Sequence, residues 1–319
     1  DNISLFANSI KILCFEKMEQ RSYVTKAEVD AQIQSVRIDI SKGPQNPAHS
    51  WIRKLDYTKK DLDGGRSFYE GKKATPADIA SGFPIERPYL EKEVIRSVGE
   101  NTVTVMKASS GQGKTTLALR AVYLLRDEYI PYQLLCCDEI KELGNIVQYF
   151  KARIQLGEKI LVLIDNLDQH FCQWNRLVSL MQSELHCHYK LIVTSREMDW
   201  YHYSGDLSNI QSLNVIKPVL EEKEAVELFR RFKEAKQLHP SITDWRGAWK
   251  KVAERQLLIE YVYLLTHGEM MAERIGTQIS EIGQSSSGKA KCEILRKVCF
   301  ADTCGVKLSV VGLYSNQAE

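Results

Sequence analysis

Residues 102–116 read TVTVMKASSGQGKTT, and this stretch decides the fold. An apolar run with strand character leads into a turn of small residues, then into Gly-Lys-Thr-Thr and a helical pattern over residues 117–122. A strand, a small-residue turn and a helix in this order form the context that a phosphate-binding loop requires. Small residues allow backbone N–H groups to converge on phosphate oxygens, and the helix presents the positive end of its dipole to them.

Individual side chains of this loop have expected roles. Lys114 would reach the β- and γ-phosphates of a nucleotide, and the Thr115 hydroxyl would lie on Mg²⁺. The other loop residues that we expect to bind the cofactor are Ser110, Gly111, Gln112, Gly113 and Thr116. Ala108 stands where the usual pattern has its first glycine. The alternative is an ordinary strand, turn and helix with a chance Gly-Lys-Thr.

A second signal is the apolar run ILVLI at residues 160–164, which ends in Asp165. A buried strand of this kind delivers its terminal carboxylate to the sheet edge beside the phosphate loop. There Asp165 would hold Mg²⁺, directly or through water. The alternative is a core strand that ends in an Asx-turn.

A third signal is the run KLIVTSR at residues 190–196, another apolar strand that ends in hydroxyls and a guanidinium. A bidentate donor such as Arg196 can contact a γ-phosphate and so distinguish ATP from ADP. The alternative is a surface arginine at the end of a strand. The loop, the acid strand and the Arg-tipped strand, in this order, predict a site for a nucleoside triphosphate.

Composition indicates a soluble globular protein with room for two or three domains. The chain has 319 residues, of which 44% are hydrophobic and 26% are charged, and its net charge is +2. No Lys/Arg-rich run suggests nucleic acid, the longest apolar runs are strand-sized, and nothing resembles a signal peptide. We therefore expect a cytoplasmic protein without a membrane partner.

Cysteine usage agrees with a reducing compartment. The chain has eight cysteines, too few for a disulfide scaffold at this length, and Cys136 and Cys137 are adjacent on an expected buried strand. The run 186–188, His-Cys-His, has the wrong spacing for structural zinc, and Cys292, Cys299 and Cys304 lack a paired CxxC.

Strands and helices alternate between residues 99 and 217, which predicts a parallel sheet. The strands are nearly continuously apolar, as they are when both faces of a sheet are covered. The five expected strands are 102–107, 132–137, 159–165, 190–195 and 209–216, with helices near 114–127, 140–155 and 172–186.

The flanking regions have a different character. A capping box at Thr25 and Glu28 opens a helix within residues 1–45, and Pro76 would start a short helix within a linker at 46–98. After residue 217 the pattern is helical only. The chain begins inside a structured segment, so we expect a piece of a longer protein in which residues 1–45 end an upstream effector.

Together these motifs resemble the STAND class of signal-transduction NTPases, relatives of the AAA+ ATPases that include the NB-ARC switches of plant resistance and apoptosome proteins. Residues 109–116, 160–168 and 194–196 are similar to the phosphate loop, acid strand and first sensor of this class. Residues 219–229 resemble the start of its helical domain. The run LLIEYVYLLTHG at 257–268 is similar to bacterial STAND proteins of antiviral defence.

The resemblance implies an α/β P-loop NTPase core at 99–217, with a five-stranded parallel sheet and a helical segment before it. An all-helical domain at 218–290 and the start of a winged-helix-like domain at 291–319 would follow. The implied function is an ATP-binding and ATP-hydrolysing switch, with ATP, ADP and Mg²⁺ as cofactors. It would form a homo-oligomer and activate an effector in antiphage or immune defence, with a downstream sensor domain and a phage protein as trigger.

The resemblance also assigns residues. Segment 83–91 would line the adenine, with Ile85 on the base and Arg87 as the arginine of that segment. Lys114, Asp165, Asp168 and Arg196 would serve catalysis, and Thr115 and Asp165 the metal. Asn166 stands where many relatives have a second acid, so either Asp168 takes that role or hydrolysis is slow. Gln256-Leu257-Leu258 replaces the proline-containing motif of NB-ARC proteins.

Two other functions remain open. One is an AAA+-type ATPase that acts on DNA, although Arg230, Arg231 and Lys233 are the only local basic cluster and lie on an otherwise acidic helix. The other is a nucleotide-binding oligomerisation module with negligible turnover.

Overall fold

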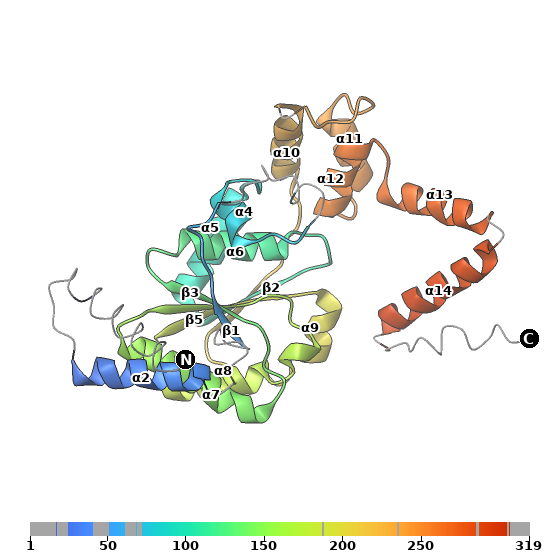
Figure 1. The fold of residues 1–319 in the computed structure, drawn as a ribbon. Coiled ribbons are helices and arrows are strands. Elements are labelled where there is room, and N and C mark those ends of the chain that lie inside the picture. The colour runs from blue at the N-terminus through green and yellow to red at the C-terminus, as the bar shows by residue number, and fades with distance from the viewer. Residues whose placement is uncertain are drawn as a thin grey trace, which may run out of the picture. The chain divides into compact units, whose positions relative to one another are not determined.

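The phosphate-loop stretch folds as strand β2 (Val103–Lys107), the loop 108–113 and helix α6 (Lys114–Leu124) (Figure 1). The computed structural model describes residues 17, 25–40, 51–60, 68, 72–186, 188–234, 236–284, 287–304 and 306. The chain divides into two compact units, Asp1–Leu220 and Glu221–Glu319. The division lies close to the expected start of the helical domain.

A six-stranded sheet forms the centre of the first unit. Its other strands are β1 (Ile52–Lys54), β3 (Ile130–Leu134), β4 (Ile160–Ile164), β5 (Tyr189–Ser195) and β6 (Leu213–Ile216). The spatial order is β1-β3-β4-β5-β2-β6. Strands β2 to β6 correspond to the five expected strands and pair in parallel, whereas β1 joins β3 antiparallel, so the sheet as a whole is mixed.

Helices cover both faces of this sheet, which explains the continuously apolar strands (Figure 1). Val162 and Val193 belong to one apolar core, together with side chains of α7 (Ile140–Gln155) and α8 (Trp174–Leu185). Their strand neighbours belong to the other core, which includes side chains of α5 (Pro88–Glu100) and α6. Because successive side chains of a strand point to opposite faces, each strand supplies both cores.

The described residues of segment 46–98, which was expected as a linker with an adenine-side stretch, pack onto the cores of this unit and form regular elements. It contributes the short helix α4 (Pro76–Ala80), which begins at Pro76 as expected. It also contributes β1 and helix α5 (Pro88–Glu100), which were not expected from the sequence. The capping box at Thr75 and Asp78 closes the first turn of α4. Residues 61–67 lie outside the described residues.

Other expectations need correction in detail. Strand β3 ends at Leu134, so Cys136 and Cys137 lie in the loop after it rather than on the strand; Cys137 is nevertheless buried. A further helix, α9 (Glu197–Tyr203), follows Arg196. The capping box at Thr25 opens α2 (Lys26–Ile40), which packs against α7, but residues 1–16 and 18–24 are outside the described range.

The second unit is helical over its described residues. Its helices are α10 (Glu222–Glu234), α11 (Trp245–Val252), α12 (Leu258–His267), α13 (Met271–Gly283) and α14 (Gly288–Cys304). The Tyr261 hydroxyl donates to the Ala225 carbonyl at 3.0 Å and so joins α12 to α10. The boundary expected at 291 falls inside α14, and residues 307–319 are outside the described range.

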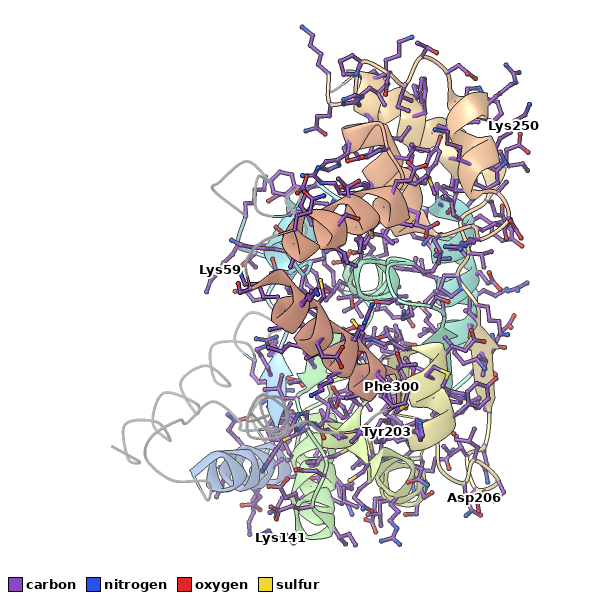
Figure 2. All side chains as sticks on the ribbon, turned by 90° about the vertical axis from the view of Figure 1, so that its right-hand side faces the viewer. Lys59, Lys141, Tyr203, Asp206, Lys250 and Phe300 are labelled. Carbon is purple, nitrogen blue, oxygen red and sulfur yellow. The ribbon has the colours of Figure 1, made fainter. Side chains whose placement is uncertain are left out.

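The last two helices of this unit differ from the first three in burial. Figure 2 labels Lys250 on α11 and Phe300 on α14, where the phenylalanine is 73% exposed. None of the residues of α13 is buried. In the described part of the chain, no helix combines the length and apolar character that crossing a membrane needs.

The core of the first unit generates a stability prediction. Phe150 on α7 is fully buried and meets Tyr132 and Tyr149 edge-on at centroid distances of 5.6 Å. Phe150→Ala should lower the free energy of unfolding by about 3–5 kcal/mol, because it leaves a cavity that the rigid sheet cannot fill. Chemical denaturation measures this change.

The matched control is Ile140→Ala on the same helix, since Ile140 is 59% exposed. We expect a change within about 0.5 kcal/mol for this variant. Equal losses for the two variants would contradict the assignment of the core.

Candidate functional site

Two glycines give the loop 108–113 its shape. Gly111 and Gly113 have φ angles of 79° and 73°, and Gly113 caps α6 in the left-handed conformation, which side chains with a Cβ rarely adopt. Ala108 has no such φ angle and is buried, with its N–H donating to the Ser195 carbonyl at 3.3 Å. Alanine therefore fits where the usual pattern has a glycine.

The loop wraps around the Lys114 side chain. Its ammonium Nζ donates to the Ala108 carbonyl at 2.9 Å and to the Ser109 carbonyl at 2.7 Å. Partial burial, and next the positive charge of Arg196, lower the pKa of Lys114, while Asp165 and Asp199 oppose the shift. Lys114 thus lies at the start of α6 among the charged groups that the sequence analysis expected beside it.

The Asp165 carboxylate is the centre of the site. Its side chain is only 2% exposed. Oδ1 accepts hydrogen bonds from the hydroxyls of Thr115 and Thr194, both at 2.8 Å. Oδ2 lies 2.8 Å from the ammonium Nζ of Lys73, which belongs to the residues just before α4. Three cationic or hydroxyl donors therefore neutralise or solvate a carboxylate that is withdrawn from water.

Strand register explains why these groups meet. Ile164 on β4 is opposite Val193 on β5, so the next residues, Asp165 and Thr194, lie side by side where both strands end. The Thr194 hydroxyl also accepts the Asn166 N–H at 2.8 Å. The Thr194 hydroxyl thus fixes both the Asp165 carboxylate and the start of the loop that follows it.

The loop after Asp165 is held by local contacts. Asn166 has a positive φ of 69° and its amide donates to Asp168 Oδ2 at 3.2 Å. Asp168 Oδ1 accepts the N–H of His170 at 2.9 Å and caps the short 3₁₀ helix η1 (Gln169–Phe171). Both carboxylate oxygens of Asp168 therefore serve the shape of this loop in the structure.

Arg196 follows β5 directly and precedes α9, at the same sheet edge. Its side chain is 54% exposed and lies 3.8 Å from Asp199 Oδ2. Its charge acts on Lys114. The structure thus brings Lys114, Thr115, Asp165 and Arg196 to one edge of the sheet.

Arg87 is a brace in this structure. Its buried guanidinium donates to the Gln112 carbonyl in the phosphate loop at 2.8 Å and to the Val219 carbonyl at 2.9 Å. These contacts tie the predicted adenine-side segment both to the loop and to the end of the first unit. Ile85 is half-buried in the same segment.

A buried ion pair supports that brace. Arg120 on α6 donates through Nε and Nη2 to both carboxylate oxygens of Glu91 on α5, at 2.5 and 3.2 Å. Glu91 Oε1 also accepts the backbone N–H of Arg87 at 2.9 Å. The start of α5 is thereby fixed against the helix that follows the phosphate loop.

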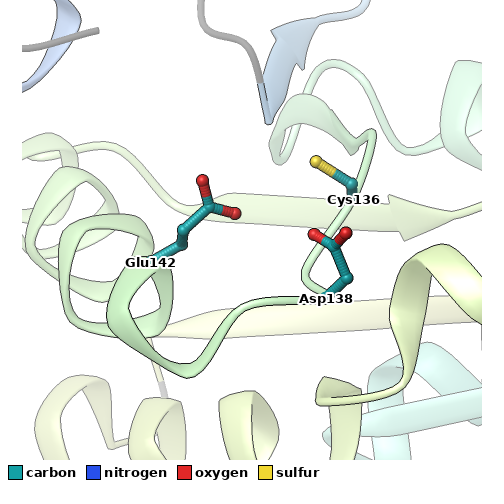
Figure 3. Close-up of side chains that lie close together, drawn as sticks. All are labelled: Cys136, Asp138 and Glu142. Atoms are coloured by element: carbon teal, nitrogen blue, oxygen red, sulfur yellow. The ribbon is translucent and has the colours of Figure 1, made fainter.

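A separate cluster lies near the end of β3. Figure 3 shows Cys136 and Asp138 in the loop after β3 and Glu142 on α7; their three ligand atoms lie within 4.8 Å of one another. Among the described residues this is the one group with such proximity. Structural zinc sites use four ligands, and three protein atoms do not complete that set. We assign this cluster no function.

The donor set around Asp165 fits a hard divalent cation. Mg²⁺ prefers oxygen ligands and is commonly held by one or two carboxylates together with substrate phosphates. Asp165 and Thr115 present oxygens within 2.8 Å of each other beside the phosphate loop. These two residues could hold Mg²⁺, as the sequence analysis expected.

Two contributors to the site were not assigned from the sequence. Thr194 belongs to the TSR run, and a pairing of β4 with β5 could have singled it out. Lys73 carries no such signal, because nothing in the residues around it indicates that it reaches the end of β4. The binding and catalytic roles expected for the site residues stay predictions.

The chain is similar to one family model and to solved structures. Residues 66–208 match the model of the family described as novel STAND NTPase 5. One similar solved structure is the Signal Transduction ATPase with Numerous Domains that carries a tetratricopeptide repeat sensor, from Pyrococcus horikoshii. It is 12% identical with a TM-score of 0.39, and the match covers 73% of this chain and 38% of that one.

A second similar structure is a Walker-type ATPase of Pyrococcus abyssi. It is 16% identical with a TM-score of 0.38, and the match covers 73% of this chain and 87% of that one. The chain thus spans well under half of the first structure's length and most of the second's. No curated protein matches the chain.

The contacts of Thr194 generate a prediction. Thr194→Val removes the hydroxyl that donates to Asp165 and accepts from Asn166, while it keeps the shape of the side chain. The free energy of unfolding should fall by about 1–3 kcal/mol, because polar groups at a buried carboxylate lose their partner. Chemical denaturation gives the value.

Ser195→Ala is the control, since within the described part of the chain the Ser195 hydroxyl makes a local hydrogen bond, to the adjacent Arg196 carbonyl. Its loss should be about 1 kcal/mol or less. A smaller loss of unfolding free energy in Thr194→Val than in Ser195→Ala would contradict the assignment of Asp165 as the centre of the site.

Proposed function

We propose that this chain, whose residues 66–208 match the family of novel STAND NTPase 5, is a P-loop NTPase that works as an ATP-dependent molecular switch. One observation carries the proposal. A carboxylate that is almost fully buried, Asp165, is hydrogen-bonded to the first hydroxyl of the phosphate-loop helix, Thr115, at 2.8 Å. A nucleotide-bound cation requires this pairing of acid and hydroxyl beside a ring of backbone N–H groups.

Binding uses groups that are already in place. The N–H groups at the start of α6 and the dipole of that helix attract the phosphates. The Lys114 ammonium, which now contacts two loop carbonyls, exchanges these for phosphate oxygens at little change in its number of hydrogen bonds. Mg²⁺ neutralises phosphate charge when it is bound, and Thr115 and Asp165 would hold it.

Turnover is proposed to be slow. Asn166 offers an amide where a second carboxylate would accept a proton from water, and amides are poor bases. Asp168 has the right chemistry, but in this structure its two oxygens cap η1 and accept from Asn166. A change in this loop would have to release Asp168 before it could serve as a base.

Arg196 supplies the proposed sensing of the third phosphate. Its guanidinium is half-exposed, its contact with Asp199 is long at 3.8 Å, and its charge acts on Lys114. Such a side chain can leave a weak partner for a γ-phosphate, which it can bind through two parallel hydrogen bonds. The bound nucleotide would then control an open, self-associating state that activates an effector.

The biological setting is a further part of this proposal. The likeness of residues 257–268 to antiviral STAND proteins supports a role in antiphage or immune defence, with an effector domain before this chain and a sensor domain after it. A phage protein would be the trigger. Protection of cells against phage, lost in Lys114→Ala, tests this part.

The two alternatives are not equally supported. Two of the three basic residues that suggested DNA binding are paired on α10, where Arg230 contacts Glu227 and Glu234, and Arg231 contacts Glu227. These contacts reduce the charge that a DNA backbone would meet. A nucleotide-binding module with negligible turnover is favoured by Asn166 and remains the second candidate.

A mutational series tests binding and turnover together. Lys114→Ala should weaken ATP binding about 10- to 100-fold, because charge-assisted hydrogen bonds to phosphate are lost. Asp165→Ala should reduce the single-turnover rate about 100-fold or more. Calorimetry and rapid-quench measurements give the two quantities.

The same assay on Asn166→Ala and Asp168→Ala separates the two functions. A wild-type protein that turns over, and loses that activity with Asp168→Ala, supports the ATPase. A wild-type protein that binds ATP but does not turn over leaves the binding module and refutes hydrolysis.

Arg196 generates a prediction of nucleotide preference. Arg196→Ala should lower the affinity for ATP about 10-fold and leave the affinity for ADP unchanged, because the lost contact is with the third phosphate only. Competition of each nucleotide against a fluorescent analogue measures both affinities. Equal weakening of ATP and ADP would show that Arg196 does not sense the γ-phosphate.

A further inference from the structure

Lys73 occupies one oxygen of the carboxylate on which the site depends. Its ammonium lies 2.8 Å from Asp165 Oδ2, whereas Oδ1 is taken by the hydroxyls of Thr115 and Thr194. With these three partners both oxygens of the carboxylate are engaged. Lys73 comes from residues 72–75, which form neither helix nor strand and lie about ninety positions before Asp165 in the chain.

The two partners differ strongly in burial. The Asp165 side chain is 2% exposed, while that of Lys73 is 65% exposed. A buried carboxylate needs a cation or several donors, because water cannot stabilise its charge. An exposed lysine, in contrast, is a point charge on a flexible stem that can return to water with its hydration restored. The Asp165 carboxylate is therefore fixed in the interior, whereas the Lys73 ammonium can move from it into water.

A nucleotide-bound Mg²⁺ and this ammonium compete for the same place. Mg²⁺ requires its oxygen ligands at about 2.0–2.1 Å in octahedral geometry, directly or through its own waters. Two cations on one carboxylate oxygen would also repel each other strongly in a site with little water. Lys73 must therefore move when the metal is bound to Asp165.

We propose that Lys73 is an internal counter-cation of the metal-binding carboxylate, which is exchanged for Mg²⁺ when the nucleotide is loaded. This inference rests on the proposed nucleotide-binding function. The lysine balances the charge of Asp165 before loading, so it lowers the affinity for Mg²⁺ by the free energy of the contact that must break. Lys73 thereby sets the Mg²⁺ concentration at which the switch is loaded.

The structure confines this exchange to a short segment. Directly after Lys73, the Thr75 and Asp78 side chains and backbones form the capping box of α4, and Ile79 is buried. Helix α4 packs against α6, the helix of the phosphate loop. Because α4 is anchored, release of Lys73 affects its own side chain and the residues before Thr75, which form neither helix nor strand.

The test compares Lys73→Met with the wild-type protein. A fluorescent ADP analogue is bound at fixed concentration while MgCl₂ is varied, and the Mg²⁺ concentration for half-maximal tightening is read. We expect this midpoint to be about 3- to 10-fold lower in Lys73→Met, because no lysine has to be displaced.

Lys159→Met is the matched control. The substitution removes the same charge from the same unit. Lys159 is exposed and directly precedes β4, so it lies at the opposite end of the strand that leads to Asp165. Its Mg²⁺ midpoint should equal that of the wild-type protein. A shift of the same size in both variants would mean that net charge, and not exchange at Asp165, moves the midpoint, and would overturn the proposal.

A second readout does not depend on nucleotide affinity. Without nucleotide and in EDTA, Lys73→Met should melt about 2–4 °C below the wild-type protein, because Asp165 has lost its cation. With saturating Mg²⁺ and ADP this difference should disappear. The two measurements report the same free energy, so the loss of melting temperature and the gain in Mg²⁺ affinity must occur together.

The other possible results of these measurements overturn the proposed exchange. An unchanged or raised midpoint in Lys73→Met overturns the exchange, and ADP affinity that falls equally at every Mg²⁺ concentration shows a phosphate contact instead. If the wild-type protein itself binds no nucleotide, the proposed function fails, and the inference fails with it. These results are distinct, because only the last one appears in the wild-type protein.

Discussion

The structure of the site depends on one buried carboxylate. Asp165 would be too costly to withdraw from water alone, and its partners come from three different parts of the chain. The sheet brings Thr194 beside it, the phosphate-loop helix brings Thr115, and the segment before α4 brings Lys73. The hydrogen bonds and the ion pair of the Asp165 carboxylate therefore connect elements that a bound nucleotide would also contact.

The sheet makes this convergence possible. The parallel strands β2, β4 and β5 end at the same edge, so the residues after them meet although they are far apart in the chain. Helices on both faces keep water from the strands, which rigidifies the edge on which Asp165 lies. Arg87 extends this support, since its guanidinium holds the Gln112 carbonyl of the loop and the Val219 carbonyl at the end of the unit.

Strong local patterns made much of this fold predictable. The five apolar strands were each expected within a few residues of their observed positions, because runs of aliphatic residues between helical segments have few other solutions. Within segment 46–98 only the short helix at Pro76 was expected; β1 and α5 were not, since β1 has three residues and α5 starts at Pro88 without a side-chain cap. Such elements owe their stability to the core on which they pack, and their own sequence carries a weak signal.

The sequence by itself determined the class of site: a glycine-containing loop before a helix, an acid at the end of a buried strand and an arginine at the end of the next. Local chemistry suffices there, because backbone φ angles and strand burial depend on nearby residues. The tertiary structure alone decided what each charge contacts. Lys73 reaches Asp165, and Arg87 braces two carbonyls, because electrostatic partners are chosen by distance in space. That distance follows from the packing of the whole unit.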